Sequence, residues 1–133
     1  MSEGKETRWR QRFDNFEKAY LILKENTERE IETDLERAGL VQLFEVAFEL
    51  SWKVLKDYLE SEGVLVRSPR ETLKQAFQLG FIENGHVWMD ALSDKNLTTH
   101  TYSRELTDKL IARIKKTYVP AMEEVYQMLK KEV

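Results

Sequence analysis

Apolar residues recur along the chain at spacings of three and four, which is the period of a helix that buries one face. The first such run predicts a helix over about residues 6 to 25, with a buried face of Trp9, Phe13, Phe16, Tyr20 and Leu23. No run of β-branched residues alternates convincingly with the period of a strand. The hydrophobic pattern therefore predicts an all-α fold.

Capping signals place the next two helices. Thr33 with Glu36 forms a capping box, which predicts a second helix over about residues 34 to 62, ended by a glycine. Ser68 at the N-cap and Pro69 at the first helical position start a short third helix, which the next glycine ends.

A fourth helix is expected from about Asn84 to Asn96, and Ser103 caps a fifth. Pro120 should kink this last helix, because proline lacks a backbone donor and its ring clashes with the preceding turn. The connections are short, which favours antiparallel neighbours. We therefore expect a single domain over residues 1–133, an antiparallel four-helix-bundle type with five helices.

The predicted second helix is apolar over more of its circumference than one narrow seam requires. Its main stripe consists of Leu40, Phe44, Ala47, Ser51, Leu55 and Tyr58, and it is widened by Leu43, Phe48, Trp52 and Leu59. So wide a face predicts either a central helix that touches several neighbours or contact with a second subunit.

Composition narrows the class of protein. The chain has 133 residues, of which 41% are hydrophobic and 34% charged, and it contains no cysteine. The absence of cysteine suits a reducing compartment, and no apolar run approaches the roughly 20 residues needed to span a bilayer. We expect a soluble cytoplasmic protein.

Charge is distributed unevenly along the chain. The formal net charge is −3, but residues 24–62 carry eleven acidic and five basic side chains, whereas residues 95–116 carry six basic and two acidic ones. The basic segment predicts a local anion site; alternatively, both segments are solvated helix faces.

The stretch between the fourth and fifth predicted helices combines several reactive groups. His100 can take or give a proton near neutral pH, and Lys95 can hold a phosphate as a point cation. Asn96 and Tyr102 can orient a substrate. In the alternative interpretation these groups are structural: Lys95 and Asn96 end a helix, Thr99 and His100 fill a turn, and Tyr102 packs on the core.

Outside this stretch, few residues are candidates for a functional role. Glu45, Glu49 and Lys53 are spaced one helical turn apart, which favours a solvated ion-pair stripe, although Glu49 would alternatively line a groove with Lys95. His86 is expected at the surface. Without an HExxH or paired-carboxylate pattern, we expect neither a metal site nor a cofactor.

Several short motifs, taken together, resemble the nucleotidyltransferase substrate-binding protein family of the HEPN superfamily. They are Arg8-Trp9-x-x-Arg12-Phe13, Gln42-x-Phe44-Glu45-x-x-Phe48-Glu49-Leu50-x-Trp52-Lys53, Ser68-Pro69-Arg70, Trp88-x-Asp90-x-Leu92, Asn96-x-Thr98-x-His100-Thr101-Tyr102 and Tyr118-x-Pro120-Ala121. The resemblance spans nearly the whole chain in the right order.

The resemblance implies a small helical bundle that accompanies a separately encoded minimal nucleotidyltransferase. Related HEPN proteins are RNase toxins with an Arg-x4-His-x-Tyr motif, neutralised by AMP transfer to the tyrosine. Lys95 takes the position of that arginine, His100 that of the histidine and Tyr102 that of the tyrosine. Lysine keeps the charge but loses the planar fork that binds phosphate with two hydrogen bonds, which weighs against RNase activity.

The sequence thus predicts a non-catalytic, homodimeric subunit that docks a minimal nucleotidyltransferase and binds a nucleotide or RNA. The alternative is a metal-independent endoribonuclease with Lys95, His100 and Tyr102 as its catalytic residues. The expected substrate-binding residues are Lys95, Asn96, Thr99, His100, Tyr102 and Glu49.

Overall fold

The computed structural model describes residues 2–97 and 103–133, and over these residues it confirms the all-helical fold. The elements are α1 (Ser2–Thr27), α2 (Asp34–Ser61), α3 (Pro69–Gln78), α4 (Gly85–Leu97), α5 (Arg104–Arg113), the π-helical segment η2 (Ile114–Tyr118) and α6 (Val119–Lys130). The last three are continuous and form the expected fifth helix. Within the described residues, no helix has the length and apolar character needed to cross a membrane.

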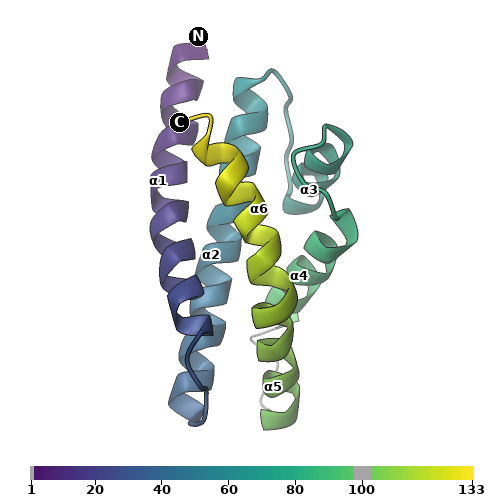
Figure 1. The fold of residues 1–133 in the computed structure, drawn as a ribbon. Coiled ribbons are helices and arrows are strands. Elements are labelled where there is room, and N and C mark those ends of the chain that lie inside the picture. Colours follow the sequence, from purple (N-terminus) through teal and green to yellow (C-terminus); the bar gives the residue numbers. More distant parts are fainter. Residues whose placement is uncertain (1, 98–102) are drawn as a thin grey trace.

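The helices are arranged as an elongated bundle (Figure 1). Helices α1 and α2 run antiparallel along their length, and the rod formed by α5, η2 and α6 returns beside them. Helix α4 lies against α2 and η2, whereas the short α3 contacts α2 and α4 at one end of the bundle. The C-terminal end of the chain lies against α1, since Arg10 Nη2 donates to the backbone oxygen of Glu132 at 3.2 Å (Figure 1).

Helix boundaries follow the capping signals in the sequence. The Thr33 hydroxyl accepts from the Glu36 backbone N–H, and the Glu36 carboxylate accepts from the Thr33 N–H, as a capping box requires. Helix α2 is followed by Gly63 and α3 by Gly80, with φ of 87° and 81°. Those backbone angles are open to glycine and strained for most other residues, so the two glycines suit the places where the chain turns.

The wide apolar face of α2 is explained within the chain. Helix α2 contacts α1, α3, α4, α5 and α6, so apolar side chains are needed around most of its circumference. Its fully buried residues include Phe44, Ala47, Phe48 and Leu55. Of the two interpretations of the sequence, the central helix is the one that accounts for this face.

The last helix changes its winding before Pro120 instead of continuing as a regular α-helix. Within η2 the backbone hydrogen bonds span five residues instead of four, so the N–H of Val119 donates to the carbonyl of Ile114. A proline ring clashes with the carbonyl four residues before it in a regular helix. A π turn directly ahead of Pro120 lets the rod continue past a residue that would otherwise break it.

Two polar clusters tie α1 to α6. The Tyr20 hydroxyl donates to Glu123 Oε1, which also lies 3.0 Å from Lys24 Nζ. In reverse, Glu17 Oε2 on α1 accepts from the Tyr126 hydroxyl and from Lys130 Nζ on α6, both at 2.7 Å. Each cluster therefore joins a carboxylate of one helix to a tyrosine of the other.

These contacts favour the ionised carboxylates. Hydrogen bonds from Gln127, Tyr20 and Lys24 outweigh burial and lower the pKa of Glu123 from 4.5 to about 2. Hydrogen bonds from Lys130 and Tyr126 likewise lower the pKa of Glu17. Because the folded-state pKa lies below the unfolded one, this stabilisation is present above the unfolded pKa and is lost as pH falls through the folded pKa.

We predict that Glu123→Gln reduces the acid sensitivity of the fold. In the wild type, the free energy of unfolding in urea should fall from about pH 5 down to about pH 2, because over this range protons bind to Glu123 in the unfolded state before they bind in the folded state. The variant should show a smaller fall. Glu25→Gln is the control, since this exposed glutamate has no ion pair within the described residues. An equal fall in the wild type and Glu123→Gln would contradict the assignment.

Candidate functional site

The candidate site is centred on the last turn of α4. Lys95 and Asn96 lie in this turn, directly before residues 98–102. The other three predicted motif residues, Thr99, His100 and Tyr102, lie outside the described residues. The positions of Lys95 and Asn96 agree with the interpretation that they end a helix.

Lys95 is held by a carboxylate from the central helix. Its Nζ lies 2.9 Å from Glu49 Oε1, and the two side chains are 27% and 32% exposed. The pair joins α4 to α2 across 46 residues of sequence. The structure therefore brings together two of the predicted substrate-binding residues.

Glu49 has further partners on its own helix. Trp52 Nε1 donates to Glu49 Oε2 at 2.6 Å, and Lys53 Nζ lies 3.9 Å from the same oxygen. Burial raises the pKa of Glu49, but the hydrogen bonds from Lys95 and Trp52 lower it by more, so the net pKa is lowered. Glu49 thus pairs with Lys53 within the helical stripe and with Lys95 on α4, and its role in substrate binding stays a prediction.

Asp94, the neighbour of Lys95, forms a second network that the sequence did not predict. Its Oδ2 accepts from Arg113 Nε at 2.8 Å and also from the Tyr118 hydroxyl. The hydrogen bond to Asp94 raises the pKa of Arg113. The pKa of Tyr118 is also raised, mainly by burial and secondly by its hydrogen bond to Asp94. A weak signal exists in the sequence, namely an arginine and a tyrosine five residues apart just before a proline.

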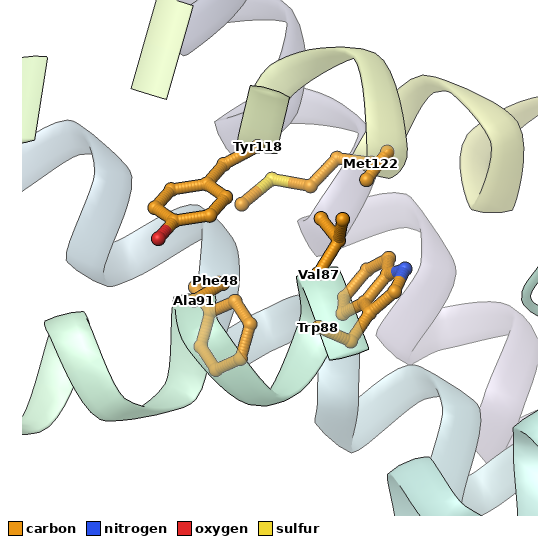
Figure 2. Close-up of a pocket in the computed structure, with 7 residues that line it drawn as sticks. Phe48, Val87, Trp88, Ala91, Tyr118 and Met122 are labelled. Atoms are coloured by element: carbon orange, nitrogen blue, oxygen red, sulfur yellow. The ribbon is translucent and has the colours of Figure 1, made fainter. Parts of the chain in front are cut away.

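An apolar crevice lies behind this network (Figure 2). Figure 2 shows Tyr118 and Met122 on one side and Val87, Trp88 and Ala91 of α4 on the other; Phe48 of α2 also lines the crevice. The crevice has no room for a water-sized molecule, so it is part of the core. Its role is to fix α4 against α2 and the last helix.

The acidic and basic segments of the sequence pair with each other in the fold. Arg104 Nη2 lies 3.0 Å from Asp34 Oδ1, and Arg37 Nε lies 2.7 Å from Asp108 Oδ1, which joins the start of α2 to α5. Lys95 likewise pairs with Glu49, so two of the six cations of the basic segment are neutralised by carboxylates of the acidic segment, whereas Arg37 and Asp108 pair in the opposite sense. His86, as expected, is exposed.

Comparison with known proteins identifies the family. A family model described as "Nucleotidyltransferase substrate binding protein like" matches residues 11–131, nearly the whole chain. The chain belongs to this family. The assignment made from the sequence motifs is thereby confirmed.

Two relatives of this family member are informative. The crystal structure of a protein from Thermus thermophilus matches with a TM-score of 0.80 at 33% identity, covering 86% of this chain and 98% of that one. A protein of Haemophilus influenzae named "Probable ribonuclease HepT" is 29% identical over 82 residues, which are 58% of this chain. The match spans only 56% of that relative's length.

We predict that Tyr118→Phe destabilises the protein by about 1.5 kcal/mol, the lower end for a hydrogen bond to a charged group, because Asp94 is partly exposed. The ring itself would remain stacked on Phe44, at 5.5 Å between centroids. Urea unfolding of a double-mutant cycle with Asp94→Asn should give a coupling energy of about 1 kcal/mol. The control is Tyr126→Phe, which removes a hydroxyl bound to Glu17 and should show no coupling energy with Asp94→Asn. If the effects of Tyr118→Phe and Asp94→Asn on the free energy of unfolding were additive, the hydrogen-bond network would be contradicted.

Proposed function

We propose that this protein is the non-catalytic, substrate-binding subunit of a two-component nucleotidyltransferase. The observation that carries the proposal is the family match over residues 11–131. The partner would be a separately encoded minimal nucleotidyltransferase. The ligand would be a nucleotide or an RNA presented to that enzyme.

The ion pair at the end of α4 suits such a ligand. Partly exposed ion pairs contribute only about 0–1 kcal/mol, so a phosphate can take the place of Glu49 on Lys95 at small cost. Glu49 would then accept a hydrogen bond from a sugar hydroxyl or a base amine. Asn96, Thr99 and His100 would complete the contacts, as proposed from the sequence motif.

A separate partner would supply the chemistry. Nucleotidyl transfer uses magnesium held by carboxylates, which bridges and neutralises the reacting phosphates. The sequence lacks the Gly-Ser followed by paired aspartates that a nucleotidyltransferase uses for this purpose. The proposal therefore assigns the metal to the partner and substrate contacts to this chain.

The proposal keeps the homodimer as an expectation. The wide apolar face of α2, which suggested a dimer from the sequence, is occupied by the other helices of the chain. A dimer is therefore supported only by the family resemblance and by exposed apolar residues such as Val46 on α2.

The docking proposal predicts a stable complex and a defined covalent product. Copurification with a minimal nucleotidyltransferase from the same genome should give a complex in size-exclusion chromatography. With ATP and magnesium, the Tyr102 phenol oxygen would attack the α-phosphate, pyrophosphate would leave, and intact mass would rise by one adenylyl group. Tyr102→Phe should abolish the adduct and Tyr126→Phe should retain it. Absence of both complex and adduct would refute the partnership.

The alternative function is a metal-independent endoribonuclease, favoured by the similarity to the probable ribonuclease HepT. In this mechanism His100 would remove the proton from a ribose 2′-hydroxyl, whose oxygen would attack the adjacent phosphorus. Lys95 would stabilise the extra negative charge on the phosphorane, and the 5′-oxygen would leave.

The ribonuclease alternative predicts cleavage of single-stranded RNA in EDTA with 2′,3′-cyclic phosphate ends. His100→Ala should lower the rate by at least about a hundredfold, the usual contribution of a general acid or base. His86→Ala is the matched control, since His86 is an exposed histidine in the first turn of α4. Cleavage that persists in His100→Ala would rule out this mechanism.

A further inference from the structure

An open cleft lies between α3 and the start of α4, which are neighbours in Figure 1. Its volume is about 510 Å³, a size typical of ligand sites. The residues that line it include Leu73, Lys74, Phe77, Glu83, Gly85 and Met89. Lys95 lies in the last turn of α4, about 15 Å along the helix from Gly85, so the cleft is separate from the candidate site.

The ring of Phe77 lies against a glycine in this cleft. A Cβ atom on Gly85 would lie 3.2 Å from Cγ and from Cδ1 of Phe77, which is closer than ordinary van der Waals contact. The lack of a side chain at Gly85 therefore lets the ring approach the backbone of α4. Phe77 is nevertheless 51% exposed, so the cleft contains an aromatic ring that is supported on one side and open to solvent.

The helix face that carries this ring is also basic. Arg70, Lys74 and Phe77 follow one another at spacings of four and three residues, which places them on one face of α3. Arg70 Nη1 lies 3.8 Å from the sulfur of Met89, a residue that lines the cleft. Within the part of the chain that the structure describes, neither Arg70 nor Lys74 forms an ion pair. An anion could therefore bind them without displacing a carboxylate.

These groups match the parts of a nucleic-acid strand. An aromatic ring can stack on a base, and exposed cations can contact phosphates. Glu83 would repel an acidic peptide, whereas it can accept a hydrogen bond from the amino group of a base. The two cations are one helical turn apart along α3, so they suit successive contacts to a backbone better than a single phosphate group.

We propose that this cleft binds single-stranded RNA, with a base stacked on Phe77 and the backbone phosphates held by Arg70 and Lys74. Aromatic stacking beside a basic surface is a general way in which proteins bind single strands with little sequence preference. The inference uses neither Lys95 nor a partner enzyme, so it stands apart from the proposed function. The exposed His86 also lines the cleft, and the proposal gives it no role.

The first test addresses the ring, by fluorescence anisotropy with a labelled single-stranded 2′-O-methyl RNA of about eight nucleotides. The methylated strand cannot be cleaved through its 2′-oxygen. Phe77→Leu keeps an apolar side chain against Gly85 but removes the ring, and it should weaken the affinity about tenfold, as expected for one lost stacking contact. Phe77→Tyr keeps the ring and should stay within about twofold of the wild type.

The second test addresses the phosphate contacts. Lys74→Gln should reduce the slope of log affinity against log salt by about 0.7, the value for one phosphate contact on a single strand. Lys18→Gln is the matched control, since Lys18 is an exposed lysine on α1, which lies on the opposite side of the bundle from α3 (Figure 1). The control should leave the slope unchanged.

Several outcomes would overturn the inference. They are a wild type that does not bind the strand, equal affinities of the wild type and Phe77→Leu, and equal salt slopes of the wild type and Lys74→Gln. A duplex of the same sequence that binds as tightly as the single strand would also overturn it, because paired bases are not available for stacking. If Phe77→Leu bound RNA normally but lost a complex with a nucleotidyltransferase, the cleft would be a protein-docking surface instead.

Discussion

The structure depends on the burial of α2 by every other helix. A central helix must be apolar around most of its circumference, so the few polar side chains near its middle have defined surroundings. Phe48 packs against Trp88 with 5.9 Å between ring centroids, which fixes α2 against α4. Glu49 follows Phe48 in the chain and pairs with Lys95 across the same interface. The position of the candidate site is thus a consequence of core packing.

Electrostatics within the chain sets a second constraint. Helices α2 and α5 pair their charges through Arg37 with Asp108 and through Arg104 with Asp34. Exposed pairs of this kind add little stability but define the relative orientation of helices. At the site itself Lys95 is paired with Glu49, so an anion there would be recognised by a few local donors and not by the summed charge of the segment.

Most of the fold could be predicted from the sequence, since it rests on local signals. Thr33, Ser68 and Ser103 cap helices where expected, and hydrophobic periodicity gave the buried faces. The π turn was not predicted, because Pro120 signals a disturbance without specifying how the preceding turn rewinds. The contacts of Lys95 with Glu49 and of Asp94 with Arg113 depend on tertiary packing, which no local pattern specifies. The parts of the motif formed by His100 and Tyr102 stay predictions.

The two ion pairs at the end of α4 differ in a way that bears on function. Catalysis by electrostatic stabilisation requires a charge that is already in place and uncompensated where negative charge develops. Lys95 does not meet this condition, because Glu49 neutralises it until a ligand arrives. After exchange, Glu49 keeps Trp52 and Lys53 as partners, so its release from Lys95 leaves no isolated buried carboxylate. A cation that changes partners at small cost suits reversible binding, and this favours the binding subunit over the ribonuclease.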